Sequence, residues 1–136
     1  MGAETARPRG VLICDDLDAI RELLRLVIDD EPTMHVVGEA ADGRAAISEA
    51  GRLQPDVILL DLAMPVMTGM EALPELRRIA PAAVIIVLSG FASSVADSEL
   101  RALGADAYIE KGSSMVAIVD TLARLAAEAA PPHIAS

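Results

Sequence analysis

Two short runs of apolar residues most constrain the fold of this chain. They are Val-Ile-Leu-Leu at 57–60 and Ala-Val-Ile-Ile-Val-Leu at 83–88, and neither run alternates between apolar and polar residues. A strand without alternation is buried on both faces, as in a parallel sheet that helices cover on either side. The two runs therefore predict strands inside such a sheet.

Strand-like and helical patterns alternate along the rest of the chain. Between the strand-like runs, hydrophobic residues recur at spacings of three and four, which is typical of one face of a helix, and 17–28 is an example. Three further strands are predicted at 11–14, 34–39 and 107–109. Five β–α units of this length predict an α/β fold built on an open, doubly wound sheet.

Residues that cap helices stand where helical patterns begin. Asp42 is the expected cap of a helix over 43–52, and Thr68 with Glu71 forms a capping-box pattern for the next helix. Pro74 lies inside that helix and is expected to shift or bend its start. The last two helices are expected to begin at serines, namely Ser93 or Ser94 and Ser113 or Ser114.

Composition excludes several functional classes. The chain has 136 residues, enough for one domain with a single core. Its net charge of −10 argues against direct binding to nucleic acid, which needs a basic surface. No apolar stretch approaches the ~18 residues of a membrane helix, and the first residues do not resemble a secretory signal. With Cys14 as the single cysteine, a reducing, cytoplasmic location is expected.

Acidic residues and the only lysine stand where predicted strands end. Asp15 and Asp16 follow the first strand, Asp61 follows the third, and Lys111 follows the fifth. Taken alone, an acidic pair favours a helix N-terminus and a lysine is usually solvated. Ligands of doubly wound sheets, however, bind outside the carboxyl ends of the strands. The coincidence at these ends predicts one site.

The charges of this cluster suggest its chemistry. Crowded carboxylates repel one another unless a cation neutralises them, and hard oxygen ligands describe Mg²⁺. A carboxylate can also attack phosphorus to form an acyl phosphate. Lys111 would then pair with a phosphoryl oxygen, and Ser89 would supply a hydroxyl from the fourth strand. Ser89 with Gly90 is, on its own, an ordinary turn signal.

Four motifs resemble the receiver domain of two-component response regulators over about residues 10–128. They are Val-Leu-Ile-Cys-Asp-Asp at 11–16, Asp-Leu-Ala-Met-Pro at 61–65 with Gly69, Leu-Ser-Gly at 88–90, and Tyr-Ile-Glu-Lys at 108–111. The resemblance implies a (βα)5 sandwich with a five-stranded parallel sheet in the order 2-1-3-4-5. Residues 1–9 would be a disordered arm, and 129–136 a tail or the start of a linker.

The resemblance also implies a role for each residue of the cluster. Asp61 would accept a phosphoryl group from a phosphohistidine on a sensor histidine kinase, and Lys111 would bind that group. Asp16 and Asp61, with the backbone carbonyl of Ala63, would bind Mg²⁺, and Asp15 would do so directly or through water.

A conformational switch and further partners follow from the same resemblance. Ser89 would move toward the phosphoryl group, and Tyr108 would turn inward into the space that Ser89 leaves. The surface of the fourth helix, last strand and last helix would rearrange. A downstream protein, an attached output domain or a second copy of the chain would bind there, whereas nucleic acid and membrane are not expected to bind directly. Two alternatives remain for the whole protein: a stand-alone receiver, or the receiver of a DNA-binding transcription regulator. The proline-free loop 112–114 resembles the loop of receivers in such regulators.

Other functional classes fit the residues less well. A haloacid dehalogenase-type phosphotransferase needs a second acid two residues after its aspartate, where Ala63 stands. No glycine-rich nucleotide-binding motif is present. The chain is expected not to be an enzyme, beyond promoting its own phosphoryl transfer and dephosphorylation. The alternative function is a phosphate-independent pseudo-receiver, disfavoured because the acidic cluster and Lys111 are all present.

Overall fold

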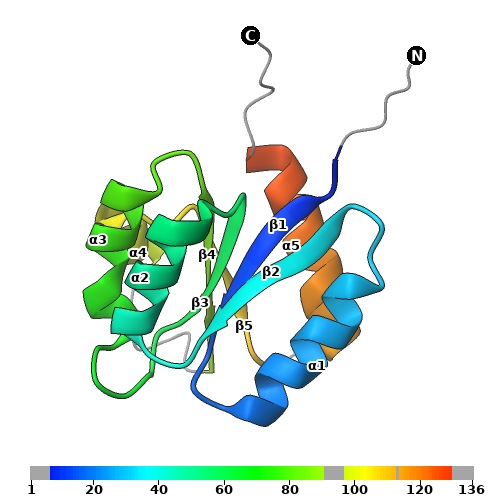
Figure 1. The fold of residues 1–136 in the computed structure, drawn as a ribbon, viewed down its shortest axis with the longest axis horizontal. Helices are drawn as coiled ribbons and strands as arrows, with labels where there is room; N and C mark the ends of the chain where they lie inside the picture. The colour runs from blue at the N-terminus through cyan, green and yellow to red at the C-terminus, as the bar shows by residue number, and fades with distance from the viewer. Residues whose placement is uncertain (1–6, 91–96, 113, 130–136) are drawn as a thin grey trace, which may run out of the picture.

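The structure, a computed structural model, describes residues 7–90, 97–112 and 114–129. Strands and helices alternate in them: β1 (Arg9–Cys14), α1 (Asp18–Asp29), β2 (Met34–Ala40), α2 (Gly43–Leu53), β3 (Val57–Asp61), α3 (Gly69–Ile79), β4 (Val84–Ser89), α4 (Asp97–Leu103), β5 (Ala107–Glu110) and α5 (Met115–Ala129). The strands form one parallel sheet in the order β2-β1-β3-β4-β5 (Figure 1). The predicted fold class and strand order are confirmed.

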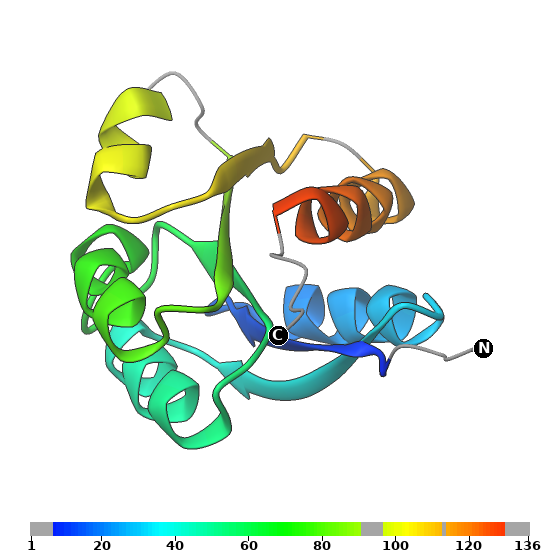
Figure 2. The same ribbon diagram turned by 90° about the horizontal axis from the view of Figure 1, so that it is seen from above.

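Helices cover both faces of the sheet. Figure 2 shows α1 and α5 on one side and α2, α3 and α4 on the other. Successive residues of a strand point to opposite faces, so Leu59 and Ile86 pack in the core under α1 and α5. Ile58 and Ile85 pack in the core under α2 and α3. Every residue of β3 and β4 is buried, as the uninterrupted apolar runs predicted.

The predicted caps of α2 and α3 are present. The Asp42 carboxylate accepts a hydrogen bond from the Ala45 amide at 2.8 Å, and Thr68 and Glu71 form the complete capping box. Helix α3 continues through Pro74 to its end. At α5, the Ser114 hydroxyl accepts from the amide of Ala117 at 3.1 Å. The alternative starts at Ser93, Ser94 and Ser113 lie outside the described residues.

Several strands extend one residue beyond their predicted ends. Asp61 is the last residue of β3 and pairs with Leu88, and Ser89 is the last residue of β4 and pairs with Glu110. Pairing with a neighbouring strand, rather than apolar character, decides where a strand ends. Two residues of the predicted site therefore lie on the sheet itself.

The ends of the described structure bear on the expected arm and tail. Strand β1 already includes Arg9, and α5 ends at Ala129. Residues 1–6 of the expected arm and 130–136 of the expected tail lie outside the described residues. Within the described part of the chain, none of the helices has the length and apolar character needed to cross a membrane.

Candidate functional site

The carboxyl ends of four strands bring the predicted site residues to one edge of the sheet. Asp15 follows β1, Asp61 ends β3, Ser89 ends β4 and Lys111 follows β5. The parallel register keeps these ends level, because Asp61 lies opposite Leu88 on β4. Residues far apart in sequence thus converge at one place, as expected for this class of sheet.

Three carboxylates form a compact acidic cluster. One oxygen from each of Asp15, Asp16 and Asp61 lies within 4.8 Å of the others. Asp15 is 1% and Asp61 4% exposed, whereas Asp16 is more exposed. A buried carboxylate is destabilising unless hydrogen bonds or opposite charge compensate it. This geometry therefore demands a positive partner.

Lys111 is a cationic partner of the two buried carboxylates. Its Nζ lies 3.1 Å from Asp15 Oδ2 and 3.4 Å from Asp61 Oδ1. Burial alone would lower the pKa of Lys111, but the charges of Asp61 and Asp15 outweigh burial and raise it. Burial raises the pKa of Asp61, and the charge of Lys111 opposes that rise. The lysine therefore stays cationic beside the carboxylates.

One ammonium group does not satisfy three carboxylates. Asp15 Oδ2 is buried and has no hydrogen-bond partner among the described residues, although it forms an ion pair with Lys111 Nζ at 3.1 Å. An oxygen of this kind, inside a group with excess negative charge, fits a divalent cation with oxygen ligands. Ala63 also lies at the site, because its amide donates to Asp61 Oδ1 at 3.3 Å.

The two residues predicted to switch lie on neighbouring strands. Ser89 is buried, and Tyr108 is half-buried against the core under α2, α3 and α4. The Tyr108 hydroxyl is buried and lacks a hydrogen-bond partner within the described ranges. Burial, followed by the charge of Glu110, raises the pKa of this phenol. An unpaired buried hydroxyl is destabilising by about 1–3 kcal/mol. A small rotation of the side chain that gave this hydroxyl a hydrogen-bond partner would remove that cost.

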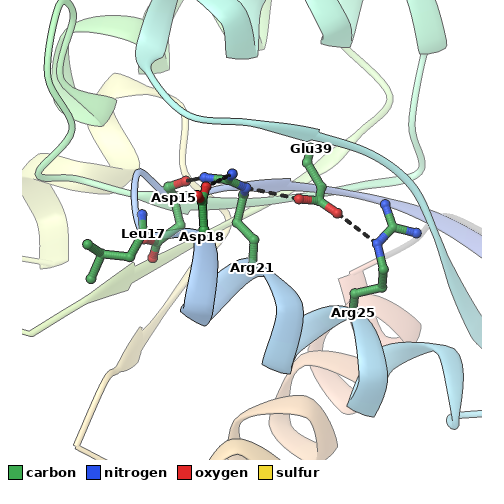
Figure 3. Close-up of polar contacts among 6 residues, drawn as sticks. All are labelled: Asp15, Leu17, Asp18, Arg21, Arg25 and Glu39. Atoms are coloured by element: carbon green, nitrogen blue, oxygen red, sulfur yellow. Dashed lines mark hydrogen bonds and ion pairs between the residues drawn. The ribbon is translucent and has the colours of Figure 1, made fainter.

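Two supporting residues were not assigned a role from the sequence. A Cβ on Gly69 would lie 2.0 Å from the carbonyl oxygen of Asp61, so only glycine allows α3 to begin against that peptide. Arg21 of α1 donates to the carbonyl of Asp15 at 2.7 Å (Figure 3). Gly69 was visible as part of a motif, whereas nothing in the sequence distinguishes Arg21 from the other arginines.

Comparison with known proteins shows which proteins the chain resembles. The family model of the response regulator receiver domain matches residues 11–123. The chain is 40% identical over 109 residues to a protein-glutamate methylesterase/protein-glutamine glutaminase of Rhodospirillum centenum, covering 79% of this chain and 28% of that protein. It is 41% identical over 120 residues to the nitrate/nitrite response regulator protein NarP of Escherichia coli, covering 86% of this chain and 54% of that protein.

Solved structures give the same result. The response regulator domain of Thermotoga maritima CheB superposes with a TM-score of 0.80 at 33% identity, over 90% of this chain and 96% of that one. A LuxR-family two-component response regulator from Aurantimonas superposes with a TM-score of 0.81 at 28% identity, over 90% of this chain and 87% of that one.

These relatives correct one prediction. The chain spans 28% to 31% of the length of several relatives that are named as methylesterases and glutaminases, which are enzymes. The prediction that the protein is not an enzyme was therefore wrong as a general exclusion. The error has a physical reason. The residues of this domain carry no information about the chemistry of the additional sequence in these longer relatives.

Proposed function

Because the chain belongs to the response regulator receiver domain family, we propose that it is a phosphorylation-controlled switch of a two-component system. Asp61 accepts the phosphoryl group from a phosphohistidine on a sensor histidine kinase. The observation that carries this proposal is the buried Asp61 carboxylate with the Lys111 ammonium 3.4 Å away. A nucleophile and a phosphate-binding cation thus lie side by side.

The transfer is a displacement at phosphorus. An oxygen of Asp61 forms a bond to phosphorus as the bond to the histidine nitrogen breaks, and the electron pair stays on the imidazole. Lys111 binds a phosphoryl oxygen as negative charge builds up on it. The nucleophile must be ionised, and the charge of Lys111 favours that state.

Asp15, Asp16 and Asp61, with the backbone carbonyl of Ala63, hold Mg²⁺ in this proposal. Two observations support it: the three carboxylates cluster within 4.8 Å, and the buried Asp15 Oδ2 has an ion pair with Lys111 but no hydrogen bond among the described residues. A bound divalent cation would neutralise both the carboxylates and the incoming phosphoryl group. The exposed position of Asp16 leaves room for water molecules, which Mg²⁺ retains in most protein sites.

Phosphorylation is read out, in this proposal, on the face formed by α4, β5 and α5. Ser89 moves toward the phosphoryl group, and Tyr108 turns inward into the space that Ser89 leaves. The unpaired Tyr108 hydroxyl supports a residue with two orientations. A downstream protein, an attached output domain or a second copy of the chain binds this face. The unit spans residues 10–128 and works in the cytoplasm, alone or within a transcription regulator.

Measurement of intact mass tests the proposal. The protein is incubated with Mg²⁺ and either acetyl phosphate or phosphoramidate, which resembles phosphohistidine. The parent should gain one phosphoryl group, and Asp61→Asn should gain none. A phosphoryl group on Asp61→Asn would place the acceptor elsewhere. A folded parent that binds Mg²⁺ yet gains nothing from either donor or from a phosphorylated kinase would favour the phosphate-independent pseudo-receiver.

A further inference from the structure

The guanidinium of Arg21 joins three parts of the fold beside the acidic cluster. It donates from Nη1 to the carbonyl oxygen of Asp15 at 2.7 Å and from Nε to Glu39 Oε1 at 2.9 Å, and it also pairs with Asp18 (Figure 3). Only 15% of the Arg21 side chain is exposed. Helix α1 is thereby tied to the end of β1 and to β2.

The contact with Arg21 completes the fixation of Asp15. The Asp15 amide donates to the carbonyl of Ala40 at 3.0 Å, and its Oδ1 accepts from the amide of Leu17 at 3.0 Å. With the carbonyl held by Arg21, the oxygen left without a hydrogen bond is Oδ2, which lies beside Lys111. The Asp15 carbonyl belongs to the peptide that leads to Asp16, so Arg21 holds the link between two carboxylates of the cluster.

Arg21 is itself held from the opposite side by Glu39. The second oxygen of Glu39 accepts from Arg25 Nε at 2.7 Å, so one carboxylate bridges two arginines on successive turns of α1. Burial alone would raise the pKa of Glu39, but Arg25 and Arg21 outweigh burial and lower it. Glu39 therefore stays ionised and keeps the Arg21 guanidinium in place.

We propose that Arg21 is a positioning residue of the cation site: its hydrogen bond to the Asp15 carbonyl orients the Asp15–Asp16 peptide so that both carboxylates converge with Asp61. This inference rests on the proposed Mg²⁺ site. Some groups do not bind a metal themselves but hydrogen-bond to its ligands and orient them. Removal of such a group typically lowers metal affinity by about 10- to 100-fold. The position of Arg21 therefore gives α1 and β2 a role in cation binding.

The sign of the change in Mg²⁺ affinity on substitution of Arg21 distinguishes a positioning role from a purely electrostatic one. A cation near an acidic cluster repels Mg²⁺, so removal of the Arg21 charge alone would strengthen Mg²⁺ binding. Loss of the hydrogen bond to Asp15 would weaken it. Arg25 offers a matched control, because it pairs with the same Glu39 but does not contact Asp15 in the structure.

Calorimetric titration with Mg²⁺ alone, at constant ionic strength, tests the proposal. Arg21→Gln should weaken Mg²⁺ binding by roughly tenfold, whereas Arg25→Gln, with the same change of charge, should stay within about twofold of the parent. Arg21→Lys keeps the charge but cannot span all three partners, so it should also bind Mg²⁺ more weakly. It serves as the deciding variant if Arg21→Gln does not fold, and circular dichroism checks that each titrated protein is folded.

Three results would overturn the proposal. Mg²⁺ binding by Arg21→Gln as tight as or tighter than the parent would mean that the hydrogen bond to Asp15 does not position the cation site. Equal weakening in Arg21→Gln and Arg25→Gln would assign the effect to the shared ion pairs with Glu39. A folded parent that binds no Mg²⁺ would refute the cation site itself, and this positioning role with it.

Discussion

Each polar atom of Asp15 has a separate function in holding the site together. Its amide donates a hydrogen bond to β2, and its carbonyl accepts one from Arg21 of α1. Its Oδ1 accepts one from Leu17 at the start of α1, and its Oδ2 lies beside Lys111. A buried charge is tolerated when its hydrogen-bonding capacity is used. The residue next to it in sequence, Asp16, is more exposed. Two adjacent aspartates thus contribute differently to one cluster.

Gly69, the first residue of α3, is expected to be hard to replace. Gly69→Ala would place a methyl group 2.0 Å from the Asp61 carbonyl oxygen, so α3 or the Asp61 peptide must move. We expect a loss of about 1–3 kcal/mol in the free energy of unfolding, measured by urea denaturation, together with weaker Mg²⁺ binding.

A control is Gly51→Ala in α2, where the added methyl group makes an ordinary 3.6 Å contact. This control should be stabilising by about 0.5–1 kcal/mol. Equal stability of Gly69→Ala and the parent would refute the steric argument.

At the scale of secondary structure, local signals specify where α2 and α3 begin. Asp42 and the pair Thr68–Glu71 bond to amides of their own helices, so a few neighbouring residues contain the whole interaction. Helix α1 differs, because no side-chain cap precedes it and Leu17 donates its amide to Asp15 instead. The start of α1 is thereby coupled to the acidic cluster, which a helix pattern alone does not indicate.

The tie between α1 and β2 should make stability depend on pH through Glu39. Its pKa is lowered in the folded protein, so its stabilising effect is fully present above its ordinary pKa of about 4.5 and is lost as the pH falls through the folded value. At pH 7, Glu39→Gln should lower the free energy of unfolding by about 1 kcal/mol. At about pH 3.5 the difference from the parent should shrink.

Urea denaturation at the two pH values measures this effect. Glu128→Gln is the control, because Glu128 pairs with Arg124 at 3.7 Å on an exposed helix surface and should change stability little at either pH. A gap between Glu39→Gln and the parent that is the same at both pH values would mean that the charge of Glu39 does not stabilise this contact.

For the whole molecule, the proposed Mg²⁺ site would couple cation binding to folding. A ligand that binds only the folded state stabilises it, so millimolar Mg²⁺ should raise the melting temperature of the unmodified protein by roughly 3 °C. Asp16→Asn should reduce that rise, whereas Asp120→Asn, an exposed acid of α5, should leave it unchanged. Sodium chloride at equal ionic strength corrects for screening. An unchanged melting temperature in Mg²⁺ would remove the basis of the metal site.

The sequence by itself determined the features that depend on neighbours along the chain. Uninterrupted apolar runs predicted strands buried on both faces, caps predicted the starts of α2 and α3, and charges at strand ends predicted one site at the carboxyl edge of the sheet. These succeed because burial on two faces, cap hydrogen bonds and strand direction are written into short segments.

Only the tertiary structure decided which atoms meet. The 3.1 Å approach of Lys111 to Asp15, the hydrogen bond from Arg21 to the Asp15 carbonyl and the close packing of Gly69 on Asp61 each join different elements. Such contacts depend on strand register and on how each helix is seated on the sheet, which residue patterns do not specify. The convergence of the charged residues at one edge of the sheet could therefore be predicted from the sequence, while the residues that hold them in position could not.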